Sequence, residues 1–112
     1  MTIIGRIALF AGVALVVPVV TAAGQTLERG AAVFAAQKCS LCHALDGKGN
    51  AKGPLDAIGS KLKAEEIRSW IVTPAEMTAK VKAERKPAMK AFPNLAKDEL
   101  DALVAFLAAK KK

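Results

Sequence analysis

The residues that could bind a metal or a prosthetic group through sulfur and nitrogen lie together. The chain has two cysteines and one histidine, and they fall within CSLCH as Cys39, Cys42 and His43. This Cys-x-x-Cys-His spacing is that of a covalent haem attachment site. The two thiols would form thioethers with vinyl groups on neighbouring pyrroles, and the imidazole that follows would bind iron through Nε2. The other ring nitrogen needs a backbone carbonyl, for which we expect that of Pro54 in KGPL.

Three other uses of the cysteine pair fit the chain less well. A thioredoxin-like redox pair follows a strand and opens a helix, whereas here a predicted helix precedes the motif and a glycine-rich loop follows it. A zinc site needs four ligands, and after these three only carboxylates remain. A structural disulfide would close too short a loop to restrain much of the chain. Haem attachment is therefore the favoured interpretation.

Haem iron has a second axial position, and a second histidine is excluded because His43 is the sole one. Met77 and Met89 are the methionines that follow the motif, although either could be a gap-filling core residue. Met77 lies three residues beyond Pro74, which leaves its loop little slack to cross the ring. Met89 lies in a longer, proline-flanked loop, so we predict His43 and Met89 as the iron ligands. Met77 and an open site stay as alternatives.

Helices are predicted to position the motif. Thr26 is a plausible N-cap for a first helix over residues 27–38, which runs into the cysteine pair. A glycine-rich loop follows, and a second helix over 63–72 ends before Pro74. The polar stretch that comes next is expected to hold at most a short solvated helix and no core element. Residues 97–112 show the clearest helical periodicity, and no strand is predicted, so the fold class is all-α.

The amino-terminal segment has the order of a secretory signal peptide. Arg6 precedes an apolar run over residues 7–20, and small residues follow it. We predict cleavage after Ala23, with the bonds on either side as competitors, so that 1–23 is removed and 24–112 is the mature domain. An uncleaved membrane anchor is the alternative, but the run is shorter than the ~20 apolar residues that a spanning helix needs. Export predicts a periplasmic protein without stable membrane insertion.

These elements together resemble the class I c-type cytochromes, a family of small monohaem proteins. The resemblance covers nearly the whole mature chain: a first helix with Gly30 and Phe34, then CSLCH, GP, a tryptophan helix, a proline-flanked methionine and LDALVAFL. It implies three to four helices wrapped around one covalent haem c, with the first and last helices crossing. Gly30 would lie at that crossing, packed with Phe34, Leu103 and Phe106. It also implies that Trp70 lies near the haem propionates, although a core tryptophan is an equal alternative.

The chain is strongly basic. The formal net charge is +7, and residues 24–112 keep 16 of the 17 basic residues and all ten acidic ones, a formal +6. The lysines flanking the motif and the methionine loop are Lys38, Lys48, Lys80, Lys82, Lys86 and Lys90. They could form a rim that steers docking onto acidic partners, such as a reductase, oxidase, dehydrogenase or reaction centre. Nucleic-acid binding is not expected, because the basic residues show no aromatic interleaving and no recognised module.

We therefore predict an exported, monomeric electron carrier that passes single electrons between larger redox proteins and is not an enzyme. A five-coordinate haem protein, binding a small ligand or acting as a peroxidase, is the rival from another class. A membrane-tethered cytochrome subunit of a redox complex is a third possibility.

Overall fold

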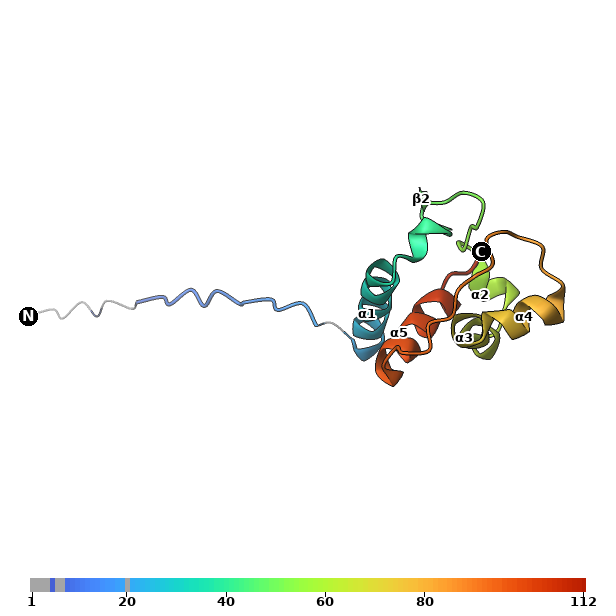
Figure 1. The fold of residues 1–112 in the computed structure, drawn as a ribbon. Helices are drawn as coiled ribbons and strands as arrows, with labels where there is room; N and C mark the ends of the chain where they lie inside the picture. Colours follow the sequence, from blue (N-terminus) through green and yellow to red (C-terminus); the bar gives the residue numbers. More distant parts are fainter. Residues whose placement is uncertain (1–4, 6–7, 20) are drawn as a thin grey trace, which may run out of the picture.

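The structure is a computed structural model that describes residues 5, 8–19 and 21–112. Residues 8–19 form an extended tail without helix or strand, and their apolar side chains are exposed (Figure 1). Arg6, Ile7 and Val20 of the predicted signal segment lie outside the described residues. No helix in the described part of the chain is both long enough and apolar enough to cross a membrane.

Five α-helices and one short 3-10 helix make up most of the folded part. The elements are α1 (Ala22–Ala36), η1 (Cys39–Leu41), β1 (Ala44–Leu45), β2 (Lys48–Gly49), α2 (Ile58–Lys61), α3 (Ala64–Val72), α4 (Pro74–Val81) and α5 (Lys97–Ala108). The prediction of an all-α fold is confirmed, since each strand is two residues long. The strands form a small hairpin, with Leu45 opposite Lys48. Asp46 and Gly47 turn it with φ of 51° and 79°, as a two-residue type I′ turn requires.

The first helix begins earlier than predicted. Thr21 has an extended backbone, and its hydroxyl oxygen accepts the Gly24 N–H at 3.2 Å, so Thr21 is the N-cap of α1. Thr26, the expected cap, lies inside the helix and donates its hydroxyl to the Ala22 carbonyl at 3.0 Å. The prediction was wrong because the small residues before Thr26 can continue the helix and a second cap residue stands upstream.

Helices α1 and α5 cross closely, as expected. Gly30 is buried at the crossing, where a Cβ would overlap the carbonyl oxygen of Ala102 and the Cβ of Phe106. The rings of Phe34 and Phe106 meet edge to face, with centroids 5.9 Å apart. Leu103 is 2% exposed beside them. The predicted cluster around Gly30 is confirmed.

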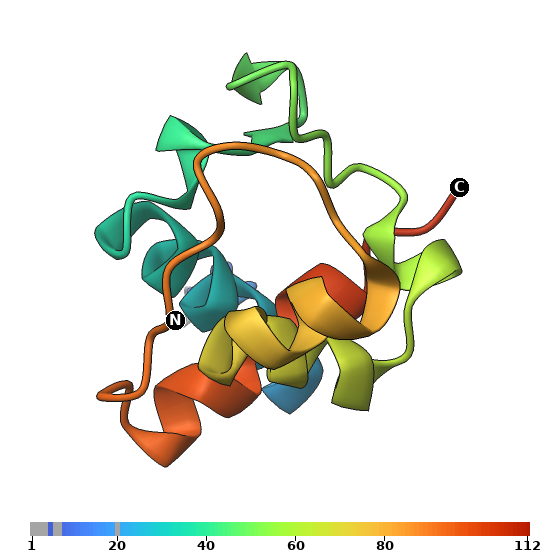
Figure 2. The ribbon, with the colours of Figure 1, turned by 45° about the vertical axis from the view of Figure 1, so that its right-hand side comes forward.

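The segment after Pro74 differs from the prediction. Pro74 is the first residue of α4, where its missing N–H leaves no helical bond unmade. Met77, in the same helix, is buried, so α4 contributes to the interior. The sequence predicts at most a short solvated helix and no core element here, because charged residues dominate the composition. Figure 2 shows the chain leaving α4 and arching past the motif before it reaches α5.

Candidate haem attachment site

The CSLCH motif is a tight turn at the end of α1. Lys38 takes a left-handed conformation (φ 57°) that ends the helix and redirects the chain. The carbonyl of Cys39 then accepts the N–H of Cys42 at 3.2 Å and that of His43 at 2.9 Å. These bonds bring the two thiols and the imidazole onto one turn. Both cysteines are free, with Cys39 half-buried against the apolar core and Cys42 exposed.

The imidazole of His43 is held by its Nδ1 atom. Nδ1 lies 3.1 Å from the carbonyl oxygen of Gly53, which also accepts the N–H of Ala44 at 3.0 Å. The predicted acceptor, Pro54, is therefore wrong by one residue. The bridge between Ala44 and Pro54 turns the Gly53 carbonyl toward the motif. A proton held on Nδ1 leaves Nε2 as the nitrogen with a free lone pair, which is the atom expected to bind iron.

Two groups of the motif have shifted pKa values. Burial lowers the pKa of His43, the Gly53 carbonyl opposes this, and the nearby Arg85 charge lowers it further. The neutral imidazole, which is the form that binds metals, is therefore favoured. Burial raises the pKa of the Cys39 thiol. The neighbouring Cys42 also raises it, whereas a backbone hydrogen bond and the charge of Lys90 lower it.

The two candidate methionines have different surroundings. Met89 is half-buried in the non-helical segment between α4 and α5 and packs against the same apolar core as Cys39. That segment is fixed to α3 by the Phe92 N–H, which donates to the Ile71 carbonyl at 2.9 Å. Met77 is buried inside α4. Trp70 is half-buried in α3, and its predicted contact with the propionates remains a prediction.

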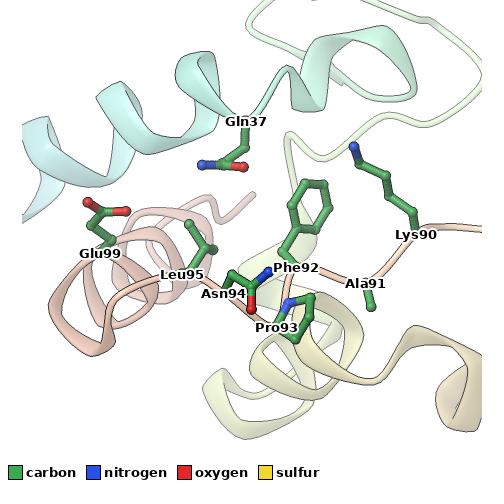
Figure 3. Close-up of a pocket in the computed structure, with 8 residues that line it drawn as sticks. All are labelled: Gln37, Lys90, Ala91, Phe92, Pro93, Asn94, Leu95 and Glu99. Carbon is green, nitrogen blue, oxygen red and sulfur yellow. The ribbon is translucent and has the colours of Figure 1, made fainter.

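A pocket of about 250 Å³ lies beside the methionine segment (Figure 3). Gln37, at the end of α1, faces Phe92 and Lys90 across it. The Lys90 Nζ atom lies 5.1 Å from the centroid of the Phe92 ring, within cation–π range. Lys90 is exposed and lies near Cys39, and the basic rim to which it was assigned stays a prediction.

The donor set and the core fit a haem. Two free thiols and an oriented imidazole share one turn, and Met89 and Cys39 contact one apolar cluster. In the described part of the chain, no large side chain is less than 2% exposed, so the polypeptide alone fills its interior incompletely. A large apolar prosthetic group would complete it.

Sequence reasoning missed two residues that contact the motif. Gly53 orients His43, and Arg85 donates from Nη2 to the carbonyl oxygen of Cys42 at 2.5 Å. Gly53 is the residue before Pro54, which the sequence analysis named as the acceptor, so the local motif could have indicated it. Arg85 is 43 residues from Cys42, and its sequence context indicates ordinary charged surface.

Comparison with known proteins agrees with this geometry. The family model described as cytochrome c matches residues 27–111. The chain is similar to cytochrome c oxidase subunit 2 of Alkalihalophilus pseudofirmus, with 29% identity over 93 residues, 75% of this chain and 25% of that protein. It thus spans about a quarter of that relative's length. No solved structure gives a significant match. Because the family model covers most of the chain, from within α1 to beyond the end of α5, the chain belongs to the cytochrome c family and carries one haem c bound covalently through Cys39 and Cys42.

Proposed function

We propose that this electron-transfer protein is an exported carrier whose iron is bound by His43 and Met89. The observation that carries the proposal is the hydrogen bond between His43 Nδ1 and the Gly53 carbonyl, which leaves Nε2 as the ligand atom. The bound haem would supply an iron that cycles between ferrous and ferric states. The chain would hold both axial ligands in place through the cycle, so that little reorganisation accompanies each transfer.

The position of Met89 supports it as the second ligand. Its segment is non-helical and passes the motif, whereas Met77 is fixed in the first half of α4. A thioether is a weak donor, so His/Met ligation would give a higher reduction potential than a pair of imidazoles.

Spectroscopy of two matched variants tests this assignment. Oxidised wild-type protein should show a weak iron–thioether charge-transfer band and, once reduced, should resist carbon monoxide. Met89→Leu should abolish the band and open the reduced iron to carbon monoxide, and Met77→Leu should do neither. The reverse pattern would assign Met77. Carbon monoxide binding by the wild type would favour the five-coordinate alternative.

Export is supported by the amino-terminal tail. Leu9 and Phe10 are about nine-tenths exposed, and the apolar side chains described in this tail take no part in the core. Removal of residues 1–23 would leave a periplasmic domain. Mass spectrometry of protein purified from its own host should give a mature chain that begins near Gly24, plus the mass of one haem. A retained segment would instead support a membrane tether.

The partners we propose are larger redox proteins with acidic docking surfaces. Lys38, Lys48 and Lys90 are exposed near the motif, where they could steer such partners to the haem. Similarity to a cytochrome c oxidase subunit 2 points toward an oxidase as one acceptor, or toward a subunit role. Electron transfer to an isolated oxidase should slow steeply as salt rises, because the rim acts through screened charges. Rates independent of salt would argue against this docking mode. No enzymatic reaction is proposed.

A further inference from the structure

Arg85 reaches the motif from a distant part of the chain. Helix α4 ends at Val81, and the left-handed backbone of its C-cap Lys82 (φ 54°) turns the chain away from the helix axis. Arg85 lies three residues later, in the segment that carries Met89. Its Nη2 atom donates to the Cys42 carbonyl at 2.5 Å, which joins this segment to the turn that holds the haem.

The same guanidinium lies across Gly53. A Cβ at Gly53 would overlap the Arg85 Nη1 atom and the carbonyl oxygen of Cys42. Gly53 is buried there, and its carbonyl is the acceptor for His43 Nδ1. Arg85 therefore contacts both the residue that precedes the proximal histidine and the residue that orients the histidine ring. The absence of a side chain at Gly53 is what allows this contact.

The guanidinium of Arg85 also lies close to the imidazole. It is packed against Gly53, whose carbonyl oxygen lies 3.1 Å from His43 Nδ1. Oxidation of haem iron adds one positive charge next to this ring. A guanidinium stays protonated throughout, so it should disfavour the ferric state at every pH used for measurement.

We propose that Arg85 is a positioning residue with two effects: it fastens the Met89 segment to the Cys42–Gly53 backbone, and its charge raises the reduction potential of the iron. The inference rests on the proposed function, because it requires Met89 to be the ligand that this segment presents. Loss of the hydrogen bond between Arg85 and the Cys42 carbonyl should let external ligands replace Met89 more easily. Loss of the charge should lower the potential.

Three variants of the holoprotein separate these effects. Arg85→Gln removes the charge, Arg85→Lys keeps the charge without the planar fork, and Lys80→Gln removes a charge from the exposed surface of α4. Imidazole binding to the ferric protein should be about tenfold tighter in both Arg85 variants, as loss of a charged hydrogen bond predicts. The potential should fall in Arg85→Gln and stay near the wild-type value in Arg85→Lys. Lys80→Gln should leave imidazole affinity unchanged and move the potential less.

The outcomes distinguish this inference from the proposed function. If wild-type protein shows the iron–thioether band but Arg85→Gln matches Lys80→Gln in potential and imidazole affinity, the role of Arg85 is overturned and the ligation stands. A loss of stability in Arg85→Gln with the potential unchanged also overturns it, because a structural contact alone would do that. If the wild type lacks the band, the proposed ligation fails, and this inference fails with it.

Discussion

At the residue scale, Gly30 and Gly53 act through the absence of a side chain. Gly30 lets α1 approach the backbone of α5, and Gly53 lets the Arg85 guanidinium lie against the loop that orients His43. Neither backbone has a positive φ, so neither glycine is required for its conformation. Both are required by close packing, and the two positions can be tested separately.

Gly30→Ala should destabilise the protein. Helix propensity alone would make alanine better by about 1 kcal/mol. The added methyl group would overlap Ala102 and Phe106, and overpacking of this kind costs roughly 1–3 kcal/mol or more. We expect a lower urea midpoint with little change in the slope. Ala32→Ser, on the exposed side of α1, is the control and should change the midpoint little. A higher midpoint for Gly30→Ala would show that the crossing can open without cost.

Gly53→Ala should be coupled to Arg85. The new Cβ would displace the guanidinium, so much of what Arg85→Gln loses is already lost in Gly53→Ala. We expect the two substitutions to be less than additive, by about 1 kcal/mol in a double-mutant cycle of unfolding free energies. Gly53→Ala paired with Lys80→Gln should be additive. Additivity of the first pair would mean that the two residues do not interact in solution.

At the element scale, α5 is joined to two other helices by ion pairs. Arg29 of α1 lies 2.6 Å from Asp98, and Arg68 of α3 lies 2.6 Å from Asp101. Lys97, one turn before Asp101, adds a contact at 2.8 Å. These pairs are largely solvated, so each should contribute modestly beside the apolar contacts of α5.

These pairs predict an acid-dependent contribution to stability. A hydrogen bond from Lys97, and next one from Arg68, lowers the pKa of Asp101 below its usual value. A carboxyl whose pKa is depressed by folding stabilises the folded state above its unfolded pKa, and this is lost as pH falls through the folded pKa. Asp101→Asn should therefore lower Tm at neutral pH, and the difference should vanish well below pH 4. Glu84→Gln, on exposed surface, is the control and should change Tm little at neutral pH. A difference that persists in strong acid would point to packing instead.

The elements differ in how far the sequence could predict them. α5 was predicted because Leu103, Val104 and Leu107 repeat at helical spacing and are buried. α4 was misjudged because its buried residues are only Pro74 and Met77, which a composition dominated by charge does not reveal. The two-residue strands are too short for any periodicity to mark. Local sequence pattern predicts an element when its buried face is long, and fails when only one or two of its residues are buried.

The same distinction holds for the site. Cys39, Cys42 and His43 form a local pattern, so their role in haem attachment was evident from their spacing. The Gly53 carbonyl and the Arg85 guanidinium reach the motif through the tertiary fold. Such partners depend on how loops return to the site, and no spacing in the sequence encodes that.

At the scale of the whole molecule, the core is too small for the polypeptide alone. Its apolar cluster consists of eight buried residues, and even the most buried, Leu103, keeps 2% of its surface exposed. Half-buried groups pack against it, including Cys39 in the motif turn and Met89 and Phe92 in the segment between α4 and α5. A domain of this size ordinarily needs a cofactor, a metal or disulfides to be stable.

Removal of the haem should therefore destabilise the fold as well as abolish the colour. In a Cys39→Ser/Cys42→Ser variant the prosthetic group has no covalent link, and the half-buried apolar groups lose their partner. We expect reduced helical circular dichroism and a broad thermal transition in place of a cooperative one, since a group that binds only the native state stabilises it. Leu41→Ala, between the cysteines and 70% exposed, is the control and should keep both haem and cooperativity. If the double variant were colourless yet melted as sharply and as high as wild type, the chain would fill its own interior. Contacts within the polypeptide, chiefly those at the α1–α5 crossing around Gly30 and the Phe34–Phe106 pair, would then be enough to stabilise the fold.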